Sequence, residues 1–103
     1  MNTKYFPKPA KFSGQAELQT TFGSSNLMIE KNSSVLFSGV IELGSFVKFS
    51  GNCIIDDGNK IGNGCEFSDV KLNKNNTVRP YSLIENTVIG QRNILGPFCF
   101  IRD

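Results

Sequence analysis

The sequence predicts an all-β protein, a single parallel β-helix of about four triangular coils. Large apolar residues stand at every sixth position in the middle of the chain, and the segments between them are rich in Gly, Ser, Asn and Asp, which turns prefer. A repeat of short strand and turn is typical of a parallel β-helix, because so short a strand buries its apolar face only by stacking. The column contains Phe37, Leu43, Phe49, Ile55, Ile61 and Phe67.

The sequence also predicts which residues of neighbouring coils stack on each other. Three such repeats per coil would place residues eighteen apart directly above each other, for example Leu43 above Ile61. The same register places Phe49 above Phe67, and strands of neighbouring coils lie about 4.8 Å apart, so we expect the two rings to stack in the centre of the core. A β-sandwich is the competing fold.

The repeat is interrupted after Phe67. Residues 69–80 are polar and rich in Asn, and the segment ends at Pro80, so we expect an irregular coil there. The apolar column then resumes. Its expected inward members are Leu83, Ile89, Leu95 and Ile101, with Tyr81 and Cys99 among the inward positions two residues earlier.

The N-terminal part of the chain fits neither column. It contains more aromatic residues than a disordered tail needs. Because a β-helix has open strand edges at its ends, we interpret residues 1–28 as an N-terminal cap and residues 29–103 as the β-helix.

The inward columns contain one amide and three thiols. We expect the buried Asn59 to be satisfied by neighbouring backbone groups. Cys53, Cys65 and Cys99 have no CxxC spacing and no histidine partner, so we expect reduced core thiols and no metal site.

Composition limits the classes of partner. The 103 residues form one domain, and the net charge of +2 is too small to indicate nucleic-acid binding. The sequence contains neither an apolar run long enough to span a membrane nor a signal-peptide pattern. We therefore expect a soluble, cytoplasmic protein that binds neither nucleic acid nor membrane.

The second half of the chain resembles the hexapeptide-repeat acyltransferase superfamily, within roughly residues 53–103. It is most similar to the start of the acetyltransferase domain of bifunctional N-acetylglucosamine-1-phosphate uridyltransferase / glucosamine-1-phosphate acetyltransferases. The matching residues are Pro80, Tyr81, Ser82, Glu85, Ile89, Gly90, Gly96, Pro97, Phe98 and Arg102. This resemblance implies a left-handed β-helix, a homotrimer, and a nucleotide sugar or acyl-CoA as ligand. It assigns substrate binding to Arg102.

Catalysis is not expected. Acyl transfer in this superfamily uses a general base, usually histidine, and the sequence contains no histidine. The family's downstream lysine, tyrosine and asparagine have no counterparts either. We expect a non-catalytic scaffold or ligand-binding module without a cofactor. The alternative is an acetyltransferase of the glucosamine-1-phosphate or nucleotide-sugar type that uses acetyl-CoA. The carboxylates that remain as candidate bases are Asp56, Asp57, Glu66, Asp69 and Glu85.

Apolar residues at outward positions indicate a contact surface. Val88, Ile94 and Phe100 stand where earlier repeats carry charges, and Phe98 and Phe46 are placed at corners. We expect Val88, Ile94, Phe98 and Phe100 to be covered by another subunit or by the N-terminal cap.

Overall fold

The computed structural model describes residues 10–20 and 27–102, which contain thirteen strands and no helix. The strands are short because each coil changes direction three times. They are β1 (Ala10–Thr20), β2 (Met28–Ile29), β3 (Ser34–Leu43), β4 (Lys48–Ser50), β5 (Asn52–Ile55), β6 (Lys60–Ile61), β7 (Glu66–Ser68), β8 (Lys71–Leu72), β9 (Thr77–Val78), β10 (Leu83–Glu85), β11 (Val88–Ile89), β12 (Ile94–Leu95) and β13 (Phe100–Arg102).

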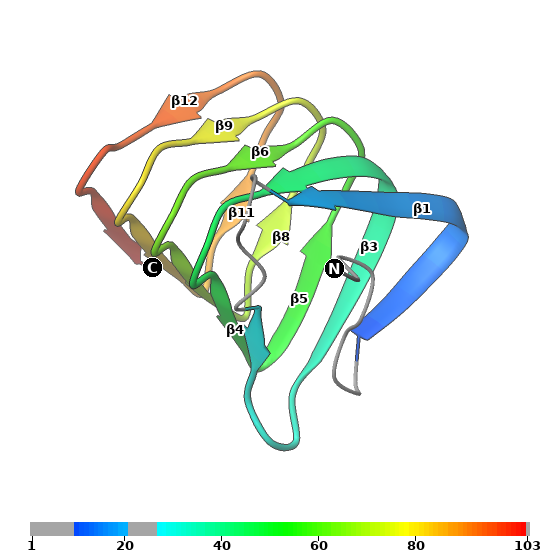
Figure 1. Cartoon of the computed structure of the whole chain (residues 1–103). Coiled ribbons are helices and arrows are strands. Elements are labelled where there is room, and N and C mark those ends of the chain that lie inside the picture. Colours follow the sequence, from blue (N-terminus) through cyan, green and yellow to red (C-terminus); the bar gives the residue numbers. More distant parts are fainter. Residues whose placement is uncertain (1–9, 21–26, 103) are drawn as a thin grey trace.

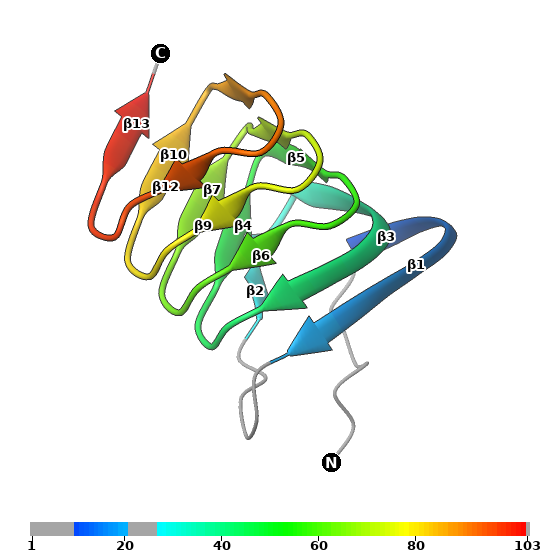
Figure 2. The ribbon, with the colours of Figure 1, turned by 90° about the horizontal axis from the view of Figure 1, so that it is seen from above.

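The strands form a solenoid with three faces (Figures 1 and 2). One sheet has the order β11-β8-β5-β3-β6-β9-β12, and it bends because β3 runs around a corner at Gly39. We call its two halves the β5 face (first half of β3, β5, β8, β11) and the β6 face (second half of β3, β6, β9, β12). The other sheet, β13-β10-β7-β4-β2, is the β7 face.

The predicted fold class is confirmed. All described strand pairs are parallel, and each strand pairs with strands of the coils before and after it. The chain makes about four turns of a left-handed parallel β-helix. Parallel pairing of consecutive coils excludes the antiparallel β-sandwich, whose strands are joined by hairpins and Greek-key connections.

The predicted stacking is also confirmed. Leu43 pairs with Ile61 and Phe49 with Phe67, and all four side chains are buried. The rings of Phe49 and Phe67 stack with centroids 5.3 Å apart and an interplanar angle of 16°, while the ring of Phe37 meets Phe49 edge-on. These rings form the centre of the core.

The coils become one residue shorter at Asp69. Before it, paired residues such as Ser34 and Asn52 are eighteen apart, whereas Ile54 and Lys71, the first strand pair after it, are seventeen apart. Asp69 occupies the same corner as Gly51 of the preceding coil, and both residues have a positive φ. Asn52, which follows Gly51, has no counterpart after Asp69. The irregularity near residues 69–80 is thus a single missing residue, and strands β8 and β9 continue the two sheets through this segment.

The shorter coil corrects the expected inward column. Ile84, not Leu83, pairs with Phe67 and is fully buried, and Leu83 faces outward. Tyr81 was expected inside but is 59% exposed, and Ser82 is buried in its place. A slip of one residue moves side chains to the opposite face of a strand, so the prediction was wrong where two adjacent apolar residues left the frame ambiguous.

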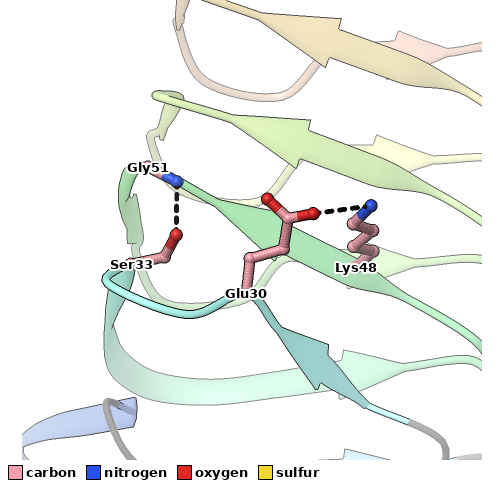
Figure 3. A network of polar contacts seen from close by, with 4 residues as sticks. All are labelled: Glu30, Ser33, Lys48 and Gly51. Atoms are coloured by element: carbon pink, nitrogen blue, oxygen red, sulfur yellow. Dashed lines mark hydrogen bonds and ion pairs between the residues drawn. The ribbon is translucent and has the colours of Figure 1, made fainter.

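At the N-terminal end of the β-helix, polar contacts join the segment after β2 to the coil that contains β4 (Figure 3). The Gly51 amide donates to Ser33 Oγ over 2.8 Å, and Lys48 Nζ lies 3.0 Å from Glu30 Oε2. The hydrogen bond and charge of Glu30 raise the pKa of the Lys48 ammonium. Strand β1 pairs with β3 in parallel and adds a strand to this end of the sheet. Residues 1–9 and 21–26 lie outside the described residues, so the cap assigned to residues 1–28 stays a prediction.

A ladder of asparagines runs through the interior. The expectation for Asn59 is confirmed: its Nδ2 donates to the carbonyls of Asp56 and Asn73, each over 2.7 Å, and its Oδ1 accepts from the Asn76 amide over 2.9 Å. Asn76, fully buried, repeats the arrangement one coil later, because its Oδ1 accepts from the Asn93 amide over 2.8 Å. The side chains supply hydrogen bonds where the backbone turns a corner and leaves its own groups unpaired.

Replacing Phe49 or Phe67 with Ala should lower the free energy of unfolding by about 3–5 kcal/mol, because each change removes a buried ring from a closed core. Chemical denaturation measures this. Val88→Ala is the control. Its side chain is 68% exposed on the β5 face, and we expect a change within about 0.5 kcal/mol. Losses below about 1 kcal/mol at both core positions would contradict the stacked core.

Asn76→Ala should cost about 2–4 kcal/mol, because it removes the buried hydrogen bonds of the Asn76 side chain to the amide of Asn93 and to the carbonyls of Asn73 and Gly90. The exposed Asn52, whose Oδ1 accepts from Ser34 Oγ, provides the control. Asn52→Ala should change the unfolding free energy by less than about 1 kcal/mol, since water replaces the lost partner. Equal effects of the two changes would argue against a special role of the interior ladder.

Candidate functional site

The resemblance to acyltransferases made Arg102 the candidate substrate-binding residue, and the structure places it on the last strand of the β7 face. The guanidinium carbon lies 5.8 Å from the ring centroid of Phe100 in the same strand, a cation–π arrangement. Arg102 is paired in register with Glu85, one coil earlier. The side chain is exposed on an open face, so this coil alone surrounds no substrate there.

In the part of the chain that the structure describes, each of the other two faces has a shallow groove, and Arg102 lines neither of these grooves. The groove on the β5 face has a volume of about 330 Å³ and lies next to the shortened corner at Asp69. It is lined by Asn52, Ile54, Asp69, Val70, Lys71, Asn86, Thr87 and Val88. The groove on the β6 face measures about 240 Å³, and Lys60, Arg79 and the anionic Glu42 are its charged lining residues.

Three of the five candidate carboxylates act as structural acceptors at corners. Asp57 Oδ1 accepts from the Val40 amide over 2.8 Å, and Asp69 Oδ1 accepts from the Asn52 amide over 2.9 Å. Asp56 Oδ1 accepts from the amide of the next residue over 2.7 Å. These hydrogen bonds either connect neighbouring coils or stabilise a turn. A structural role therefore explains why aspartate stands at these three positions.

The other two carboxylates, Glu66 and Glu85, lie on the β7 face at outward positions. Glu85 is therefore the candidate base that the fold brings next to Arg102, through the pairing of β10 with β13. Within residues 10–20 and 27–102, no three His, Cys, Asp or Glu side chains gather into a group that could hold a metal ion.

The three cysteines are free thiols. Cys53 and Cys65 are buried, as expected, and Cys99 is only half-buried. Burial raises the pKa of the Cys53 and Cys65 thiols, because the interior disfavours the charged thiolate. The Cys65 thiol donates to the Arg79 carbonyl over 3.2 Å. Both buried groups are therefore poor nucleophiles at neutral pH.

The four residues expected at an interface do not share one surface. Val88 is 68% exposed on the β5 face, Ile94 is 64% exposed on the β6 face, and Phe100 is 56% exposed on the β7 face. Phe98 is 76% exposed at the corner where the β6 and β7 faces meet. Ile94, Phe98 and Phe100 therefore flank one corner, and Val88 lies on the third face.

Two further aromatic residues lie at this corner: Phe46, which the sequence placed at a corner, and Tyr81, which was expected inside. Phe46 and Tyr81 are each 59% exposed, and the Tyr81 ring stacks on Phe98 with centroids 5.6 Å apart. In the coil between those of Phe46 and Tyr81, the same corner is occupied by Gly64, whose amide donates to the Ser45 carbonyl. The recurrence of an aromatic residue at the coil period was the available signal, but it was hidden because Tyr81 was assigned to the interior.

The six-residue repeat and the parallel β-helix define the class of protein. Together with the relatives described next, they fit a hexapeptide-repeat, acetyltransferase-like domain, as the sequence predicted. No protein-family model matches the chain. None of the described segments is a helix of the length and apolarity needed to cross a membrane.

The relatives share one name. The chain is 40% identical over 57 residues to Bifunctional protein GlmU of Wigglesworthia glossinidia brevipalpis, a match that covers 55% of this chain and 12% of the relative. It is 33% identical over 70 residues to the protein of that name from Acinetobacter baylyi, covering 62% of this chain and 15% of the relative. The corresponding values for Azoarcus sp. are 32% over 74 residues, with 72% and 14% covered. The chain thus corresponds to about one seventh of the length of these relatives.

Iodoacetamide should label Cys99 first in the folded protein, with Cys53 and Cys65 reacting only as the chain unfolds. The thiolate is the reactive form, and burial holds the pKa of both interior thiols above the ordinary value. Mass spectrometry of timed samples with and without denaturant gives the order of labelling. Rapid labelling of all three thiols without denaturant would contradict the closed interior.

Proposed function

We propose that this chain is a non-catalytic module that assembles with copies of itself into a homotrimer. Its relation to sugar-nucleotide acetyltransferases is supported by the GlmU relatives and by the β-helix. The proposed location is the cytoplasm, and neither nucleic acid nor membrane is a proposed partner.

The observation that carries this proposal is the change of outward residues along the stack of coils. On the β6 face the outward column runs Glu42, Lys60, Thr77 and Ile94. On the β7 face it runs Lys48, Glu66, Leu83 and Phe100. Exposed apolar side chains gathered in one coil are unusual on a surface that faces only water, and they favour burial against another polypeptide.

The proposed absence of catalysis is supported by the side chains that could act as a base or bind a substrate. The sequence has no histidine to act as general base at neutral pH. Asp56, Asp57 and Asp69 already accept backbone hydrogen bonds, and Arg102 lies on an open face. A nucleotide sugar or acyl-CoA remains a proposed ligand, since Arg102 offers the planar donors that a phosphate accepts in pairs.

The alternative is an acetyltransferase that uses acetyl-CoA and a glucosamine-1-phosphate or nucleotide-sugar acceptor. The placement of Glu85 beside Arg102 favours this alternative, because it puts a candidate base and an anion-binding group on neighbouring strands. Such a site would need further walls to exclude water, and the described coils do not supply them.

Light scattering on the purified chain should give a mass of three copies at micromolar concentration. The expected contact buries apolar residues that would otherwise face water. A monomer over the whole accessible concentration range would overturn the proposed assembly.

Incubation with acetyl-CoA and glucosamine-1-phosphate should release free thiol no faster than a protein-free control. A colorimetric thiol assay measures this release, after correction for the protein's own cysteines. Turnover well above background that is lost in both Arg102→Ala and Glu85→Gln would support the acetyltransferase alternative instead.

A further inference from the structure

The sequence contains a single Asn–Gly dipeptide, Asn63–Gly64, at the corner between β6 and β7 (Figure 2). Asparagine is one of the thermally labile residues, and a following glycine has no side chain to hinder attack on it. The attacking group is the backbone nitrogen of Gly64, and its target is Cγ of Asn63. This dipeptide is therefore the place in the chain where a spontaneous covalent change is chemically easiest.

The change is a deamidation that needs only water. The Gly64 nitrogen gives its proton to the solvent and forms a bond to Asn63 Cγ, and the side-chain amide leaves as ammonia with a proton taken from water. The product is a five-membered cyclic imide. Water then cleaves one of its two carbonyl–nitrogen bonds. One cleavage gives an aspartate at position 63, and the other gives an isoaspartate, in which the main chain runs through the former side chain.

Three hydrogen bonds to neighbouring coils hold this dipeptide in the folded protein. Asn63 Oδ1 accepts from the Ser45 amide over 2.7 Å, and the Gly64 amide donates to the Ser45 carbonyl over 2.8 Å. From the following coil, the Tyr81 amide donates to the Asn63 carbonyl over 2.8 Å. Ring closure consumes the N–H of Gly64 and draws the Asn63 side chain onto that nitrogen, so it breaks both bonds to Ser45. The fold therefore opposes the reaction.

The same three hydrogen bonds recur at another corner, around Asp57–Gly58. Asp57 Oδ1 accepts from the Val40 amide over 2.8 Å, and the Gly58 amide donates to the Val40 carbonyl over 2.9 Å. The Asn75 amide donates to the Asp57 carbonyl over 3.1 Å. A carboxylate has no good leaving group, so the chemistry singles out Asn63. The recurrence also shows that an aspartate side chain satisfies this type of corner.

The two products of deamidation fit the corner differently. An aspartate at position 63 keeps the acceptor oxygen, in the arrangement that Asp57 shows. An isoaspartate adds one atom to the main chain directly before Gly64. The strand that follows pairs in fixed register, with Glu66 beside Lys48, and a longer main chain moves the Gly64 amide away from its acceptor. The corner therefore accommodates the aspartate but not the isoaspartate.

We propose that Asn63–Gly64 is a latent site of covalent self-modification, closed in the folded coil and opened when the coil around it unfolds. The exposed Asn63 side chain leaves water free to reach the site, so the hydrogen bonds to Ser45 are what prevents the reaction. Once the coil opens, ammonia is lost and the isoaspartate product does not re-form the corner. This inference is independent of the proposed assembly.

The first test compares the whole chain in buffer and in guanidinium chloride at the same mildly alkaline pH. Digestion and mass spectrometry of timed samples follow the mass increase at Asn63 that accompanies replacement of the side-chain NH₂ by OH. Deamidation in denaturant should be at least about tenfold faster than in buffer, because only the opened fraction of folded molecules reacts. Equal rates in the two conditions would overturn the proposal.

Asn32, which is exposed and precedes Ser33, provides the internal control. The Ser33 amide donates within its own turn, to the Glu30 carbonyl over 3.1 Å, and not to a neighbouring coil. In denaturant Asn63 should react faster than Asn32, because glycine hinders attack less than serine. Folding should slow the reaction of Asn63 by the larger factor, so the ratio of the two rates should fall. Equal slowing at both asparagines would contradict the role of the bonds to Ser45.

The second test separates the two products. Protein aged in denaturant is returned to buffer, and size-exclusion chromatography divides folded molecules from the rest. The folded fraction should contain aspartate at position 63 and be depleted of isoaspartate, which peptide retention times distinguish. The Asn63→Asp variant provides the reference and should unfold at nearly the wild-type denaturant midpoint. Equal proportions of isoaspartate in both fractions, or an Asn63→Asp variant that does not fold, would overturn the different fit of the two products.

Discussion

Each coil of this β-helix depends on its neighbours for backbone hydrogen bonds, and that dependence sets the rest of the structure. Strands as short as Lys60–Ile61 have no stable partner within their own coil. They pair in parallel with the coils on both sides, at amide-to-oxygen distances such as 2.9 Å for Lys60 to Asn76. Because pairing repeats coil after coil, every side chain is placed above its counterpart. Columns, not single residues, are the units of this protein.

The interior and the surface use the columns differently. Inside, like stacks on like, as the Phe49 and Phe67 rings and the ladder from Asn59 to Asn76 illustrate. Burial supplies the main stabilisation there, and the amides satisfy the polar backbone at corners. Outside, the columns of the β6 and β7 faces change sign of charge between the first two coils, as in Glu42 followed by Lys60, and become uncharged and then apolar in the later coils. Because the polarity of the outward residues changes from the first coil to the last, the two ends of each face differ chemically. A face of uniform composition would have no such difference.

The candidate chemistry is sparse by comparison. Carboxylates such as Asp57 and Asp69 hold neighbouring coils together through backbone amides, and Arg102 lies on an open face beside Phe100. The exposed rings of Phe46, Tyr81 and Phe98 are a feature that folding alone does not explain, because Gly and polar residues meet the same backbone requirement at the other corners. The surface, rather than a pocket, therefore carries the functional argument for this chain.

By itself the sequence determined the fold class, the coil spacing around Phe49 and Phe67, and the hydrogen-bonded burial of Asn59. These follow from the six-residue repeat of apolar residues, which is visible in the sequence. It did not determine which of Leu83 and Ile84 faces the core. Both are apolar, and the loss of one residue at Asp69 becomes visible only when Ile84 is paired with Phe67. Only the tertiary structure decided that Val88 lies apart from Ile94 and Phe100, because a chain that turns three corners per coil distributes successive outward residues over three faces. The same winding brought Phe46, Tyr81 and Phe98 to one corner, a proximity that sequence distance conceals.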